Sequence, residues 1–81
     1  MKIKQNDIIL IKLVNKKDKD DFIEELFIGD YYEDKNILDV IYKELSEDLN
    51  TYFIKDISIY DKYDINNKED ITIKVYRSLI W

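Results

Sequence analysis

The sequence lacks cysteine, histidine, proline and alanine, and it contains a single glycine, Gly29. Without cysteine the chain cannot form a disulfide, a thiolate zinc site or a thiol nucleophile. Without histidine it has neither the commonest general base nor the commonest transition-metal ligand. One glycine cannot build the loops that hold phosphates in nucleotide-binding folds. These absences exclude most familiar catalytic and cofactor-binding motifs.

Long apolar runs are also missing. The longest begins at Ile8 and stops before Lys12, which is too short for a signal-peptide core or a membrane span. We therefore expect no membrane partner and a cytoplasmic protein, in the host cytoplasm if a phage encodes it. The 81 residues leave room for one compact domain, 1–81, and 15 isoleucines and 11 aromatic residues make disorder improbable.

The first half of the chain is expected to hold one strand and one helix. Residues 8–14 are β-branched and apolar on both faces, which is typical of a strand that is covered on both sides or central in its sheet. Asp18 can cap a helix over about 18–28, and Gly29 suits a left-handed end to it. The apolar stripe of this predicted helix comprises Phe22, Ile23, Leu26 and Phe27.

The second half is expected to hold one helix and two strands. Asn36 can cap a helix that ends near Asn50, and residues 52–60 and 71–80 alternate between apolar and polar. The prediction is an α+β fold in the order β-α-α-β-β, with a three-stranded, mainly antiparallel sheet packed against two helices.

The alternation also predicts how the last two strands pair. Antiparallel partners share a face, so odd-numbered apolar residues should oppose odd-numbered ones. Ile59 would then pair with Ile73 and Ile57 with Val75, which leaves 64–68 as the connecting loop.

Carboxylates are the main remaining source of chemistry, and none of the 18 stands in a recognisable catalytic motif. Asp18, Asp20, Asp21 and Glu24 look superficially like calcium ligands. The sixth position of that calcium loop, which needs glycine, is Ile23. We expect no enzyme activity, no catalytic residue, no cofactor and no metal site.

The charges are unevenly distributed along the chain. Residues 1–17 carry a balance of +4, residues 18–48 a balance of −9, and residues 49–81 are neutral, for a net charge of −5. If 18–48 is helical, its apolar stripes leave the carboxylates on exposed faces. Such a field repels nucleic acid and speeds association with basic surfaces, although exposed helices are also charged simply for solubility.

The aromatic residues also favour a binding protein. Phe22, Phe27 and Phe53 could anchor a core of this size. Tyr31 and Tyr32 stand among acidic residues in the predicted interhelical loop, and tyrosine is common at binding hot spots. The apolar end of the chain at Trp81 could complete the last strand or contribute to a dimer contact.

In composition and charge layout the chain resembles the small acidic inhibitors that phages and mobile elements make against host defence nucleases, such as anti-CRISPR proteins. That resemblance implies a non-enzymatic inhibitor that blocks a basic, nucleic-acid-binding surface of a host protein, with carboxylates standing where DNA or RNA phosphates would lie. It implies no direct binding of nucleic acid. The alternative is a small homodimeric structural or regulatory accessory protein that uses its apolar strands. The predicted partner-binding residues are Asp20, Asp21, Glu24, Glu25, Asp30, Tyr31, Tyr32, Glu33, Asp34, Glu44, Glu47 and Asp48.

Overall fold

An antiparallel sheet of four strands forms the frame of this α+β protein. The computed structural model describes the backbone of residues 1–80 and the side chains of residues 1–77. The strands are β1 (Asp7–Asn15), β2 (Phe22–Ile28), β3 (Tyr52–Asp61) and β4 (Asp64–Asp70). They lie in the order β2-β1-β3-β4, so the apolar strand β1 and strand β3 occupy the centre.

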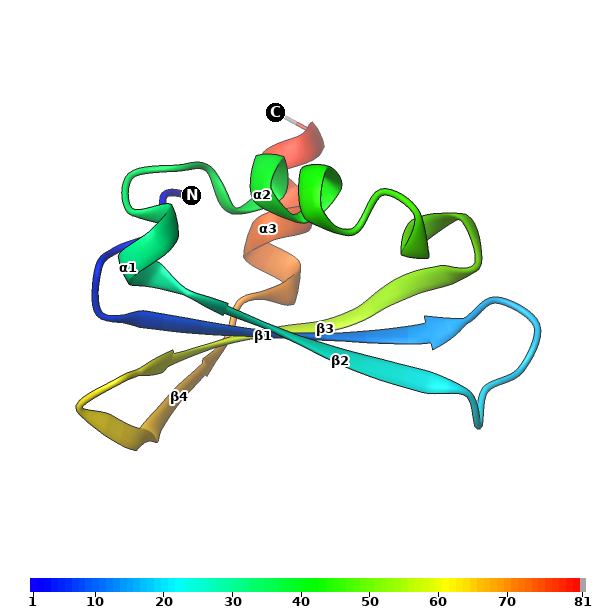
Figure 1. Cartoon of the computed structure of the whole chain (residues 1–81), viewed down its shortest axis with the longest axis horizontal. Helices are drawn as coiled ribbons and strands as arrows, with labels where there is room; N and C mark the ends of the chain where they lie inside the picture. The colour runs from blue at the N-terminus through cyan, green and yellow to red at the C-terminus, as the bar shows by residue number, and fades with distance from the viewer. Residues whose placement is uncertain (81) are drawn as a thin grey trace.

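The helices all lie on one side of this sheet (Figure 1). They are α1 (Gly29–Tyr32), α2 (Ile37–Glu44), the 3-10 helix η1 (Asp48–Asn50) and α3 (Thr72–Ile80). No helix in the described part of the chain is long and apolar enough to cross a membrane. The opposite side of the sheet carries no element at all among residues 1–80 (Figure 1).

The core lies between the helices and the sheet. Ile9, Ile11 and Leu13 of β1 point to this side and are at most 1% exposed. Their cross-strand partners share the side, because paired residues of antiparallel strands face the same way. The remaining buried members of the core are Ile3, Phe27, Ile37, Leu38, Val40, Ile41, Leu45, Ile54, Ile57, Ile71 and Val75.

The prediction of a helix over 18–28 is wrong, because residues 22–28 form β2. In this strand Ile23 and Phe27 face the helices, whereas Phe22 and Leu26 face the uncovered side. A strand with apolar residues on both faces loses its simple alternation, and spacings of three and four then imitate a helical stripe. Pairing with β1 along its whole length decides the outcome in favour of the strand.

Gly29 does not end a helix in a left-handed conformation, since its φ is not positive. It begins α1 instead, and it is buried beneath the turn that precedes β1. A Cβ atom here would lie 2.1 Å from the carbonyl oxygen of Lys4 and 2.8 Å from that of Asp7. This position requires glycine for space and not for its backbone angles.

The prediction of a last strand over 71–80 is also wrong, because Thr72–Ile80 forms α3. Ile71 and Val75 lie one helical turn apart and are both buried, whereas Ile73 is 66% exposed. The side chain of Asp70 accepts hydrogen bonds from the backbone nitrogen and the hydroxyl of Thr72, which fixes the start of the helix.

The predicted pairing of Ile59 with Ile73 fails for the same reason. Ile59 is opposite Glu69, and the chain turns at Lys62 and Tyr63 instead of over 64–68. Strand β4 is exposed at every position, so it has no apolar pattern from which it could have been recognised. The sheet therefore has four strands in place of three, and the order β-α-α-β-β is wrong.

Three predicted features are confirmed. Strands occupy 7–15 and 52–61, and the side chain of Asn36 caps α2 by accepting a hydrogen bond from the Leu38 nitrogen at 2.9 Å. The regular helix is shorter than expected and ends at Glu44, with the chain continuing as η1.

Candidate functional site

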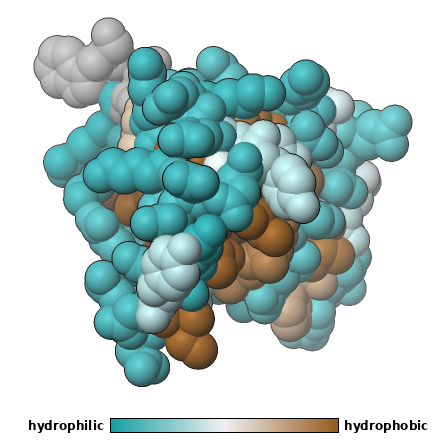
Figure 2. Space-filling model, turned by 60° about the vertical axis from the view of Figure 1, so that its left-hand side comes forward, coloured by the Kyte–Doolittle hydropathy of each residue, from teal (hydrophilic) through white to brown (hydrophobic). Residues whose placement is uncertain are grey.

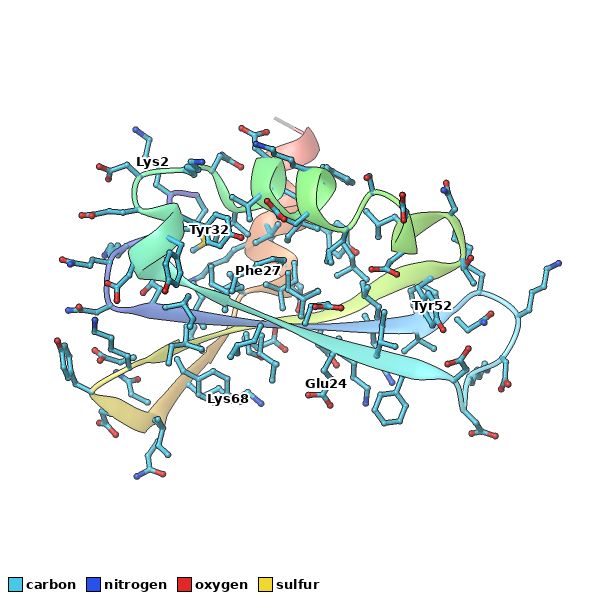
Figure 3. All side chains as sticks on the ribbon, in the orientation of Figure 1. Lys2, Glu24, Phe27, Tyr32, Tyr52 and Lys68 are labelled. Carbon is cyan, nitrogen blue, oxygen red and sulfur yellow. The ribbon has the colours of Figure 1, made fainter. Side chains whose placement is uncertain are left out.

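The uncovered side of the sheet, here called the open face, carries its side chains in four rows that run across the strands. Each row follows from the register of the paired strands. Figure 3 shows Glu24 and Lys68 of this face pointing away from the helices, and Phe27 and Tyr32 on the helical side. The rows are Phe22–Val14–Phe53, Glu24–Lys12–Asp56, Leu26–Leu10–Ser58–Asp70 and Ile28–Ile8–Tyr60–Lys68.

Large apolar side chains are exposed on this face. Phe22 is 50% exposed, Leu26 54% and Phe53 46%. Figure 2 shows apolar surface in the lower half of the molecule, at the level of the sheet, between hydrophilic groups. Phe22 and Phe53 share the first row, and the charged second row separates them from Leu26. Several large apolar side chains exposed on one face mark a candidate site for protein binding.

The second row places a lysine between two carboxylates. Lys12 is opposite Glu24 on β2 and opposite Asp56 on β3. Within residues 1–77 neither carboxylate forms an ion pair with it, and its Nζ lies 4.5 Å from the centroid of the Phe22 ring. A shallow hollow of about 230 Å³ lies over this row and extends towards Ser58 and Lys68. Lys12 and Asp56 are half-buried and Glu24 is exposed, and no ion pair joins them within residues 1–77.

The first four predicted partner-binding residues do not share a helix. Asp20 and Asp21 lie in the loop between β1 and β2, Glu24 lies on the open face, and Glu25 lies on the helical side. The carboxylate of Asp21 accepts hydrogen bonds from the Asn15 amide at 3.0 Å and from the Tyr52 hydroxyl at 2.9 Å. Asp21 therefore holds the β1–β2 loop to β3.

The hydroxyl of Tyr52 lies among the acidic groups of this loop. Its hydrogen bond to Asp21 raises the pKa of the Tyr52 hydroxyl above its ordinary value, with smaller contributions from burial and from the nearby carboxylates of Asp48 and Asp18. These acidic groups gather at one end of the molecule, where β1 ends and η1 lies (Figure 1).

The second predicted group lies at the opposite end of the sheet, in and after α1 (Figure 1). Tyr31 is 77% exposed. Tyr32 packs edge-on against Phe27, with ring centroids 5.6 Å apart. The carboxylate of Asp30 accepts hydrogen bonds from Lys62, and this bond raises the pKa of the lysine. Glu33 and Asp34 follow in the exposed loop.

The last predicted group, Glu44, Glu47 and Asp48, lies on the helical layer at the end of α2 and in η1. The structure thus spreads the twelve predicted residues over both ends of the sheet, its open face and its helical side. Asp21 and Asp48 lie near each other beside Tyr52, but the set as a whole is not brought together. The end at Trp81 lies outside the described residues.

Other polar clusters carry balanced charge. A groove of about 480 Å³ beside α2 is lined by three lysines and three carboxylates, so it favours neither anions nor cations. Among the described residues no group of three acidic side chains is placed to hold a metal ion. The open face differs from these clusters, because it combines exposed large apolar side chains with a charged hollow.

Comparisons with protein families, with curated protein sequences and with solved structures give no match for this chain.

The sequence contained one sign of the open face. Residues 8–14 are apolar on both sides, and this was interpreted as a strand with cover on both sides or a central place in its sheet. The strand is central, but helices cover only one of its two apolar sides. Phe22, Leu26 and Phe53 were assigned to the interior, because a sequence cannot indicate which face of a sheet lacks a covering layer.

Proposed function

We propose that this chain is a small, non-catalytic protein-binding module that binds through the open face of its sheet. The observation that carries the proposal is the exposure of Phe22, Leu26 and Phe53 on a face over which the described chain places no second layer. Full burial of such a side chain contributes about 1.5–3 kcal/mol, and because these three are already about half buried each can add roughly 1 kcal/mol to the stability of a complex.

The shape of the face supports a broad partner and not a small ligand. Its hollow is lined by Lys12, Glu24, Asp56, Ser58 and Lys68, but its volume of about 230 Å³ is below the usual size of a small-ligand pocket. Aromatic residues such as Phe22 and Phe53 are enriched at protein interfaces, where they supply large apolar contact area.

The test is a comparison of two equally polar substitutions. Leu26→Glu places a charge on the open face, and Ile65→Glu places one on a residue of β4 that is more exposed (54% and 69% exposed). The tagged parent protein is expected to retain a partner from its source cells, identified by mass spectrometry. Leu26→Glu should lose that partner at least tenfold while Ile65→Glu keeps it. Equal retention by both variants would contradict the proposal.

A second candidate function is the inhibition of a basic, nucleic-acid-binding protein surface. The observation that favours it is the net charge of −5 together with the exposed Tyr31, which is flanked by Asp30, Glu33 and Asp34. On this proposal the carboxylates stand in for phosphates, and the tyrosine supplies apolar area. The two functions are compatible, since they use different surfaces.

A further inference from the structure

The open face is complementary to itself, and we propose that its occupant is a second copy of this chain. This inference rests on the proposed function, because it names the partner of the same face. It is carried by the order of the residues along the two central strands, β1 and β3.

The two central strands differ in side-chain size and charge at each row. In the four rows β1 supplies Val14, Lys12, Leu10 and Ile8, and β3 supplies Phe53, Asp56, Ser58 and Tyr60. Each row therefore places a positive group beside a negative one, or an aliphatic group beside an aromatic or small one. A dimer that exchanges the two strands would bring these unlike groups together.

One symmetry axis achieves that exchange. A two-fold axis that lies in the interface, parallel to the strands and between β1 and β3, sets β1 of one copy over β3 of the other. Lys12 then meets Asp56 of the second copy, and Asp56 meets Lys12 of the second copy. Because the contact is isologous, the single complementary pair occurs twice. Two aligned sheets cross at about 30°, so the central rows stay in register.

The apolar groups of the two central strands fit under the same axis, whereas Leu26 of the outer strand lies opposite Asp70 of the second copy. Val14 lies opposite Phe53 of the second copy, and Ile8 lies opposite Tyr60. Leu10 lies opposite Ser58, a small residue that lines the same hollow as Leu10. The long stem of Lys68 on the outer strand can cover Ile28 of the second copy and keep its charge in water.

Other axes are less favourable. An axis centred on β1 sets Lys12 against Lys12. An axis perpendicular to the strands, between the second and third rows, sets all three charges of the second row against Leu26, Leu10 and Ser58, whereas the parallel axis leaves only Glu24 of that row without a facing partner. A buried charge without a partner costs several kcal/mol. Within residues 1–77 of the single chain Lys12 forms no ion pair, and its ammonium lies over the Phe22 ring, which it would leave to meet Asp56 of the second copy.

The test uses charge reversal and rescue, measured by sedimentation of the purified full chain. The parent should be a dimer at micromolar concentration. Lys12→Glu sets two acidic groups opposite each other, and Asp56→Lys sets two lysines opposite each other, so each variant alone should weaken dimerisation at least tenfold. An equimolar mixture of the two should restore the dimer, because every facing pair is again of opposite charge. The double variant K12E/D56K should dimerise by itself.

Two variants on the helical layer serve as controls. Lys43→Glu and Glu44→Lys make the same charge changes on α2, away from the sheet, and should remain dimeric. Circular dichroism and thermal unfolding check that each variant is folded.

A parent chain that stays monomeric up to about 100 μM, or a mixture that fails to restore the dimer, would overturn the proposal. Binding of a different protein that is lost with Leu26→Glu would still support the open face as a binding surface. The two proposals can therefore fail separately.

Discussion

Gly29 packs so closely against the backbone of a neighbouring turn that there is no room for a Cβ atom. The position touches backbone oxygens of the turn before β1, and these cannot move away as a flexible side chain would. Gly29→Ala should therefore destabilise the fold by about 2 kcal/mol, measured by urea unfolding. Asp34 is the converse case, because a residue other than glycine adopts a left-handed φ of 66° there. Asp34→Gly should leave the free energy of unfolding unchanged or slightly higher, since glycine adopts that angle readily. An equal loss in both variants would contradict this account.

The start of α3 gives a prediction about acid stability. The two hydrogen bonds from Thr72 lower the pKa of Asp70 below its ordinary value. A lowered carboxylate pKa adds stability that is complete above about pH 4 and is lost as the pH falls through the lowered value. Asp70→Asn should therefore reduce the dependence of the melting temperature on pH below 4, whereas Thr72→Ser should keep it. An unchanged acid limb in Asp70→Asn would show that this carboxylate is not responsible.

Among the elements, α3 distinguishes most clearly between the helical period of buried residues and the strand period that the sequence predicts. A strand would bury Ile71 and Ile73 alike, but in the helix Ile71 is fully buried and Ile73 is 66% exposed. Ile71→Ala should cost about 2–5 kcal/mol of stability, and Ile73→Ala should cost less than about 0.5 kcal/mol. Chemical denaturation of both variants makes the comparison. Equal losses would favour the strand.

The same comparison explains how much of the fold could be predicted from the sequence. The strand at 7–15 and the cap at Asn36 depend on local chemistry, so local patterns identified them. Strand β2 depends on pairing with β1, and its two apolar faces concealed its period. Strand β4 is exposed throughout and is held by β3, and its single apolar residue, Ile65, forms no alternating pattern that could mark it. The candidate site was missed for a related reason, because which apolar face lacks cover is decided by where the helices pack.

For the whole molecule, the acidic residues of 18–48 form separate patches and not the single helical surface that the sequence predicts. Glu33, Glu44 and Glu47 are exposed and spread over the helical layer. Changing all three to Lys should leave the fold intact, since exposed charges contribute little individually. If the chain inhibits a basic partner, the same change should weaken that complex at least tenfold, mainly through slower association, and flatten its salt dependence. Unchanged affinity would mean that these charges serve solubility.

The central claim is that the open face is the surface that becomes covered. Hydroxyl-radical labelling with mass spectrometry measures this residue by residue, on the dilute chain and on the isolated complex with whatever partner it binds, a second copy included. The account predicts that labelling of Phe22, Leu26 and Phe53 falls several-fold in the complex, while labelling of the exposed Tyr31 and Tyr63 stays the same. Protection of Tyr31 with unchanged labelling of Phe22 and Phe53 would contradict it and would place the binding surface at the acidic end beside α1.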